Sequence, residues 1–107
     1  MQKTVEFLDR VKAEYLLDSD YQLAHKLDIS KQAISKFRTG RHFFGNVAAV
    51  KVAELLDLLP MYVLACSHLE RSIFKNDSDD AKFWQRYVDR FSSCDSVAQT
   101  QYSLLFD

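Results

Sequence analysis

Apolar residues recur at spacings of three and four along most of the chain, and these spacings place side chains on one face of an α-helix. Near the start, for example, Leu8, Val11 and Tyr15 share a face. Short polar stretches separate the periodic segments. The pattern predicts helices over residues 4–15, 20–27, 31–38, 47–58, 60–74 and 79–93.

Residues suited to helix starts support these boundaries. Ser19 is followed three residues later by Gln22, which is the spacing of a capping box. Ser30 and Asn46 are expected to cap the third and fourth helices, because their short polar side chains can accept a bond from a free backbone N–H. Pro60 suits the first turn of the fifth helix.

Length and composition narrow the fold class. The 107 residues include only two glycines and one proline, and this shortage of turn residues favours helices. A chain of about 100 residues is the usual size of one small domain. We therefore expect an all-α protein, with a compact five-helix domain over residues 1–75 and an additional C-terminal helix and tail over residues 76–107.

No segment is expected to enter or cross a membrane. The longest apolar run, residues 58–66, contains a proline and has about half the length that a spanning helix requires. Glu6 interrupts the stretch where a signal peptide would be apolar. Two cysteines, Cys66 and Cys94, are too few for a disulfide scaffold. The expected location is the cytoplasm.

The formal net charge of −1 conceals an uneven distribution of charge along the chain. Residues 19–46 carry a net charge of +3, because five basic side chains outnumber two acidic ones. Residues 77–107 carry a net charge of −3. A basic middle and an acidic end predict that the middle of the chain faces a polyanion.

Residues 20–40 combine two short helices and a tight turn, which is the arrangement of a helix-turn-helix. The apolar residues expected to form its shared core are Leu23, Leu27, Ile29, Ile34 and Phe37, with the small Ala24 allowing close approach. That core would turn the polar side chains of the second helix outward. These are Lys31, Gln32, Ser35, Lys36 and Arg38. Such groups suit the major groove of DNA, where an amide can pair with adenine and an ammonium group with guanine.

Other polar residues beside this helix are candidates for phosphate contacts. Arg41 and His42 follow it in the exit loop, and Gln22 lies at the start of the preceding helix. From Lys31 to Arg41 the chain contains no acidic residue. Cations in this position can hold phosphates and set the register of base contacts. The segment therefore predicts binding to double-stranded DNA.

This segment resembles the Cro/C1-type (lambda-repressor-like, XRE) helix-turn-helix family of phage and bacterial regulators. The matching residues are Leu23-Ala24, Ile29-Ser30, Gln32-Ala33-Ile34-Ser35 and Arg38-Thr39-Gly40-Arg41. The resemblance implies five helices in residues 4–74, with base-reading positions at Lys31, Gln32, Ser35 and Lys36. Asp28 stands where the family usually has glycine, and aspartate tolerates a left-handed backbone better than most residues. The resemblance implies a sequence-specific transcription regulator, a phage or prophage repressor that acts as a dimer on an operator.

The last predicted helix carries a broad aromatic stripe. Its members are Phe83, Trp84, Tyr87 and Phe91. The stripe either packs on the rest of the domain or forms a homodimer interface that sets two recognition helices about one DNA turn apart. A second hypothesis makes the chain a protein-interaction regulator of the antitoxin or antirepressor type. It would use this helix and the apolar tail to bind another regulatory protein. The sequence leaves the role of residues 94–107 open.

The sequence shows no pattern typical of an enzyme. Its three histidines and two cysteines lack a recurrent metal-ligand spacing. It has no glycine-rich phosphate loop and no pair of carboxylates in settings that would separate their pKa values. Cys66 lies on an apolar helical face, where a cysteine is usually a core residue. We expect no catalysis, no metal site and no cofactor.

Overall fold

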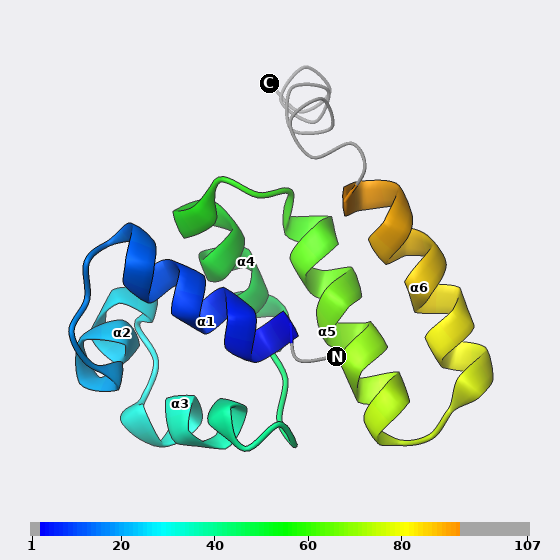
Figure 1. Cartoon of the computed structure of the whole chain (residues 1–107), viewed down its shortest axis with the longest axis horizontal. Helices are drawn as coiled ribbons and strands as arrows, with labels where there is room; N and C mark the ends of the chain where they lie inside the picture. Colours follow the sequence, from blue (N-terminus) through cyan, green and yellow to red (C-terminus); the bar gives the residue numbers. More distant parts are fainter. Residues whose placement is uncertain (1–2, 93–107) are drawn as a thin grey trace.

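The computed structural model describes residues 3–92, and these form α-helices with no strand among them. In chain order the helices are α1 (Lys3–Glu14), α2 (Asp20–Leu27), α3 (Lys31–Arg38), α4 (Asn46–Leu56), α5 (Pro60–Phe74) and α6 (Ser78–Ser92) (Figure 1). Each begins and ends within two residues of a helix that the apolar pattern predicts. The all-α class is confirmed for this part of the chain, whereas the predictions for the tail after Cys94 lie outside the described residues.

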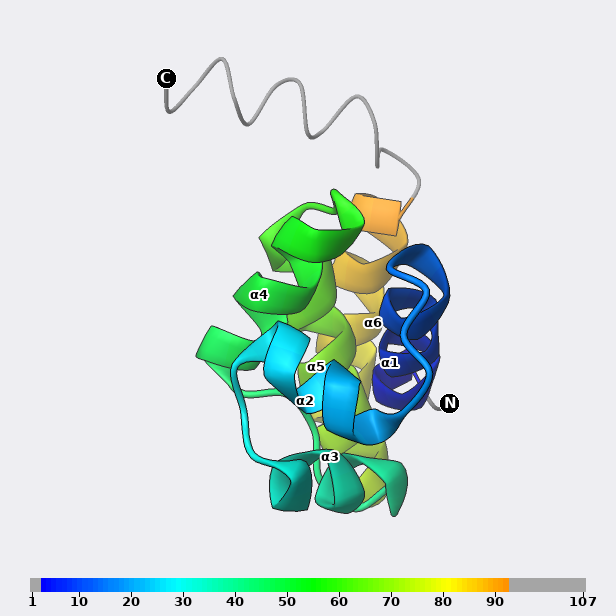
Figure 2. The same cartoon turned by 90° about the vertical axis from the view of Figure 1, so that its left-hand side faces the viewer.

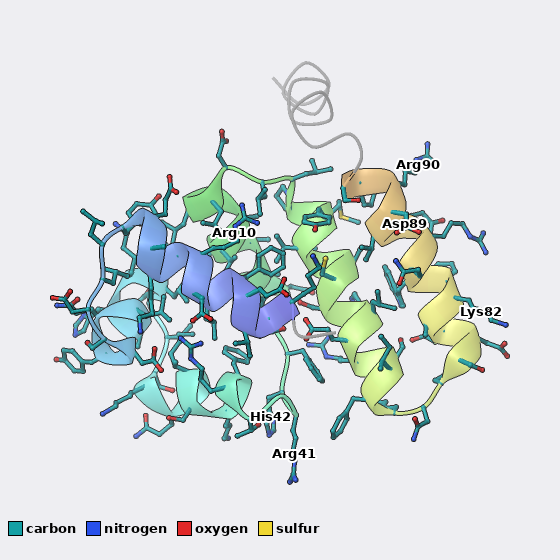
Figure 3. All side chains as sticks on the ribbon, viewed as in Figure 1. Arg10, Arg41, His42, Lys82, Asp89 and Arg90 are labelled. Carbon is teal, nitrogen blue, oxygen red and sulfur yellow. The ribbon has the colours of Figure 1, made fainter. Side chains whose placement is uncertain are left out.

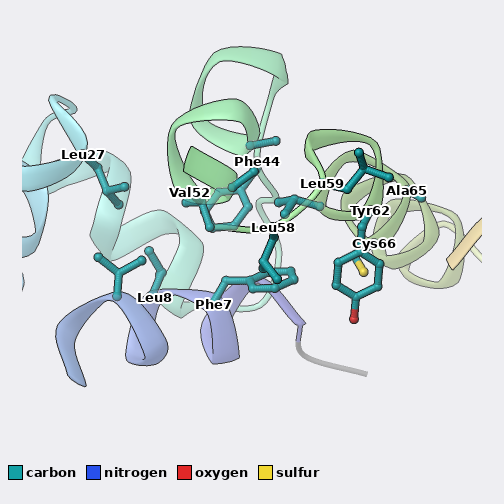
Figure 4. Close-up of a cluster of buried hydrophobic side chains, with 14 of the residues drawn as sticks. Phe7, Leu8, Leu27, Phe44, Val52, Leu58, Leu59, Tyr62, Ala65 and Cys66 are labelled. Atoms are coloured by element: carbon teal, nitrogen blue, oxygen red, sulfur yellow. The ribbon is translucent and has the colours of Figure 1, made fainter. Parts of the chain in front are cut away.

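The core lies where α1, α4 and α5 meet. Helices α2 and α3 pack against one side of this group and α6 packs against α5 on the other, as Figure 1 and, from a second direction, Figure 2 show. In Figure 4, Phe7 of α1 reaches toward Tyr62 of α5, and their rings meet edge to face with centroids 6.0 Å apart. Burial of this apolar surface is the main stabilising contribution to a domain of this size.

Two of the three predicted N-caps are confirmed. The hydroxyl of Ser19 accepts a bond from the backbone N–H of Gln22 at 3.2 Å, and the hydroxyl of Ser30 accepts one from Ala33 at 3.0 Å. The prediction for Asn46 is wrong, because Asn46 is already the first residue of α4. Gly45 takes the cap position there and offers no side chain to the free N–H groups of the helix.

Asp28, at the position where the resembled family usually has glycine, has a left-handed backbone. Its φ of 56° and ψ of 44° end α2 and turn the chain toward α3. The N–H of the next residue, Ile29, donates to the carbonyl of Ala24 at 3.0 Å, so the turn satisfies a carbonyl that the end of the helix leaves free. The short connection between α2 and α3 is therefore built from backbone bonds.

A buried carboxylate holds the start of α1 against α5. Glu70 is 4 % exposed, and one of its oxygens accepts bonds from both the N–H of Thr4 at 2.7 Å and its hydroxyl at 2.9 Å. Burial raises the pKa of Glu70, and the two bonds from Thr4 oppose that rise. Because the N–H groups of a first helical turn lack partners within the helix, Glu70 acts as a cap supplied by a distant part of the chain.

Candidate nucleic-acid interface

Helix α3 separates its side chains into a buried face and an outward face. Ile34 is fully buried, and Ala33 and Phe37 are half-buried against the core. The four predicted base-reading residues are exposed together on the opposite side: Lys31, Gln32, Ser35 and Lys36. The predicted inward and outward faces of this helix are therefore the ones that the structure has.

Helix α2 supports α3 through apolar contact. Leu23 and Leu27 are buried, and Ala24 is almost fully covered, so the pair packs closely where the sequence has its small residue. Ile29 in the turn is half-buried against the same core. This packing fixes the direction in which the outward face of α3 points.

Arg38 differs from the other predicted contact residues, because its guanidinium is bound within the protein. Nη1 donates to Asp9 of α1 at 2.6 Å, and Nη2 donates to Asp20 of α2 at 3.0 Å. Lys12 adds a bond to Asp20 at 3.4 Å. The hydrogen bond from Arg38 lowers the pKa of Asp20. Arg38 thus ties α3 to α1 and α2, and its charge is neutralised inside the molecule.

The loop after α3 presents two further predicted residues. Gly40 has a φ of 77°, a left-handed conformation that suits glycine, and turns the chain away from the helix. The hydroxyl of Thr39 donates to the carbonyl of Lys36 at 2.6 Å and accepts the N–H of Arg41 at 3.2 Å. Arg41 and His42 are exposed, and Figure 3 shows the Arg41 side chain extended away from the protein at the edge that α3 occupies.

Contacts at Phe44 anchor this exit loop. The fully buried ring of Phe44 meets the ring of Phe37 edge to face, with centroids 5.0 Å apart. From α5, Nη2 of Arg71 donates to the carbonyl of Phe44 at 2.7 Å. Arg71 is not among the residues predicted from the sequence. Its signal was weak: it is the single lysine or arginine of α5, and its partner is a backbone oxygen 27 residues away.

Gln22 lies at the start of α2, as predicted, and uses its amide oxygen within the protein. Oε1 accepts the N–H of Asp18 at 2.6 Å. Gln22 is exposed, so its NH₂ group remains available as a donor to a phosphate.

Most of the aromatic stripe of α6 packs within the molecule. The ring of Trp84 stacks on His68 of α5, with centroids 4.3 Å apart and an interplanar angle of 12°. Tyr87 and Phe91 are also half-buried against the core. Phe83, at 43 % exposed, is the member of the stripe that faces outward most fully.

Residues 3–92 offer no metal site and no membrane-spanning helix. They hold no group of three or more metal-ligating side chains, and none of their helices is long and apolar enough to cross a bilayer. Cys66 is buried, and burial raises the pKa of its thiol to about 11, which disfavours the reactive thiolate. Its position matches the core role expected from the sequence.

Among known proteins, the chain is similar to a protein of a bacteriophage. It is 30 % identical over 89 residues to an uncharacterized protein, Gp-c, of Pseudoalteromonas phage PM2, and the matched region covers 79 % of this chain and 94 % of the phage protein. The chain belongs to the family of this phage protein. No family model matches the sequence. No solved structure matches it.

Proposed function

We propose that the protein is a sequence-specific DNA-binding transcriptional regulator. The observation that carries this proposal is the outward face of α3, where Lys31, Gln32, Ser35 and Lys36 are exposed together. The segment from Lys31 to Arg41 contains no acidic residue that would oppose a phosphate backbone. The proposal identifies α2 and α3 as a helix-turn-helix and α3 as its recognition helix.

The residues divide into two roles under this proposal. Gln32 and Ser35 read base edges in the major groove, where an amide can pair with adenine through two bonds. Lys31 and Lys36 contact either bases or phosphates, depending on how the helix is positioned in the groove. Arg41, His42 and the amide of Gln22 hold phosphates and set that register. Arg38 is left out of the contact surface, because Asp9 and Asp20 already bind it.

The wider arrangement supports a repressor of the lambda-like type. The five helices α1 to α5 follow one another in the order that the sequence resemblance implies, and the related protein comes from a phage. A single recognition helix reads few base pairs. The proposed form of the protein is therefore a dimer that binds a two-fold symmetric operator. Repression by blocking a promoter follows as the default mode.

Selection of bound duplexes from a random-sequence library tests the proposal. The protein is expected to enrich a two-fold symmetric motif with half-sites about 10 base pairs apart. A Gln32→Ala, Ser35→Ala double variant is expected to lose or change that motif. Gln85→Ala on the exposed side of α6 is the control and should enrich the original motif. If the protein enriches no motif even at low salt, it is not a sequence-specific DNA-binding protein.

A further inference from the structure

The C-terminal end of α5 lies at the same edge of the molecule as α3 and the exit loop. Figure 1 and Figure 2 both show these segments at the lower end of the structure. Phe74, the last residue of α5, is 54 % exposed, and Lys75, which follows it, is exposed as well. More than half of this aromatic residue is therefore open to solvent.

This end of α5 is joined to the exit loop by direct contacts. The rings of Phe43 and Phe74 meet edge to face, with centroids 6.0 Å apart. One turn earlier, Nη2 of Arg71 donates to the carbonyl of Phe43 at 3.3 Å as well as to that of Phe44. A ligand that binds Arg41 in the loop would therefore also come close to Phe74 and Lys75. We call Arg41, Phe43, Phe74 and Lys75 the α5 edge.

The charge of the α5 edge matches a polyanion. Arg41 and Lys75 are both exposed. Three carboxylates follow Lys75 at the start of α6. Asp77 accepts the N–H of Asp80 at 3.1 Å and the carboxylate of Asp80 bonds the hydroxyl of Ser72, so both are held against their own helix or α5, while Asp79 is exposed. An apolar ring between two cations suits the sugar–phosphate backbone, because the sugar is the least polar part of that backbone.

We propose that the α5 edge binds the DNA backbone outside the bases that α3 reads. Lys75 binds a phosphate, together with Arg41, and the ring of Phe74 packs against a deoxyribose. This inference rests on the proposed function, and it extends the footprint of each subunit beyond its helix-turn-helix.

Lys75→Ala tests the phosphate contact, with the duplex selected from the random library as the probe. Each phosphate contact contributes about 0.9 to the slope of log affinity against log salt concentration. The variant is expected to bind on the order of tenfold more weakly at low salt, with a slope smaller by about 0.9. Lys82→Ala is the matched control, since Lys82 is an exposed lysine that points away from this edge in Figure 3, and it should leave affinity and slope unchanged.

Phe74→Ala tests the sugar contact by a different signature. An apolar contact releases no counterions, so this variant should bind more weakly, by about three- to tenfold, with an unchanged salt slope. Phe74→Leu keeps an apolar side chain and should restore most of the affinity. Hydroxyl-radical footprinting should also show that protection at the outer edge of each half-site is lost in Lys75→Ala.

The outcomes separate this inference from the proposed function. If the unaltered protein binds no duplex, the proposed function fails. If it binds a selected duplex, but Lys75→Ala and Phe74→Ala match it in affinity, salt slope and footprint, then DNA binding stands and the α5 edge is not part of the interface.

Discussion

The outward residues of α3 differ in what their removal should change. Lys31 and Lys36 carry charge, whereas Gln32 carries only donors and acceptors. Ile34 and Phe37 on the opposite face hold the helix in place, so none of the exposed side chains is needed for packing. Substitutions on this face therefore report on binding without disturbing the fold.

Gln32→Ala should weaken discrimination at one base position of each half-site. The lost preference should be about 1–3 kcal/mol at that position, because one amide that can pair with a base is removed. The salt slope should not change, since no charge is lost. Competition with duplexes altered at single positions measures this effect. An unaltered specificity profile would show that Gln32 does not read a base.

Arg38→Ala should lower stability, because it removes the ion pairs between α3 and both α1 and α2. The expected loss is about 1 kcal/mol at neutral pH for a partly exposed network. Asp20 has a pKa below its ordinary value of 3.8, so this contribution is present above that value and disappears as the pH falls through the lowered pKa. Urea denaturation at several pH values measures the effect.

A matched control distinguishes the loss of these pairs from the loss of a charge. Arg86→Ala removes an exposed arginine from α6 and should change stability by less than about 0.5 kcal/mol. Equal stability for Arg38→Ala and Arg86→Ala would mean that the network with Asp9 and Asp20 does not hold α3.

For the helices, the sequence predicts the features that are determined by neighbouring residues, namely where each helix runs and which residue caps it. The six helices and the caps at Ser19 and Ser30 all follow from patterns within a few positions, whereas the left-handed turn at Asp28 is implied by the family resemblance. Asn46 shows the limit even there, because a suitable cap residue became the first residue of its helix.

Contacts between distant segments could not be predicted from the sequence. Arginine is common where proteins contact DNA, and Arg38 lies in a basic segment of the sequence. Only the structure shows that its guanidinium bonds Asp9 and Asp20 within the protein. Glutamate is a residue type that is rarely buried, yet Glu70 is buried against Thr4, 66 positions away. Partners of this kind depend on how helices pack, and a single sequence does not specify that.

Glu70, which links α1 to α5, should make the stability of the protein depend on pH. Because burial raises the pKa of Glu70, the folded state favours its protonated form, and stability should fall as the pH rises from the ordinary value of 4.5 through the raised pKa. Glu70→Gln keeps an oxygen that can accept the Thr4 bonds and should remove this part of the pH profile. An unchanged profile would contradict the assignment.

Glu70→Ala should be more damaging than Glu70→Gln. It leaves the N–H and hydroxyl of Thr4 without their acceptor in a buried site, at a cost of roughly 1–3 kcal/mol. Thermal or urea denaturation of the two variants at one pH measures the difference. Equal stability of the two variants would show that the bonds from Thr4 contribute little.

In the whole molecule, α3 and α6 lie on opposite sides of the central helices (Figure 1). The basic outward face of α3 lies at one edge, while α6, with its acidic first turn, packs only on α5 among the described helices. Most of the aromatic stripe of α6 is used in that packing. Of the interface residues expected from the sequence, Phe83 is the one most available to a second copy of the chain.

Phe83→Ala should therefore weaken self-association, by on the order of tenfold in the dimer dissociation constant, without loss of helical content. Sedimentation velocity over a range of concentrations measures the effect. Met61→Ala is a suitable control. Met61 is similarly exposed, at 45 %, and lies in the first turn of α5, whereas Phe83 lies near the start of α6, which follows the last turn of α5. If both variants associate like the unaltered protein, Phe83 lies outside the dimer interface.

The salt dependence of DNA affinity shows whether the outward face of α3 binds duplex DNA. The Lys31→Ala, Lys36→Ala variant is compared with a Lys82→Ala, Arg86→Ala variant, which loses the same charge from α6. The α3 variant is expected to bind much more weakly, with a salt slope reduced by up to about 1.8, while the α6 variant matches the unaltered protein. No binding to duplex DNA at low salt, or equal slopes for the two variants, would contradict this expectation.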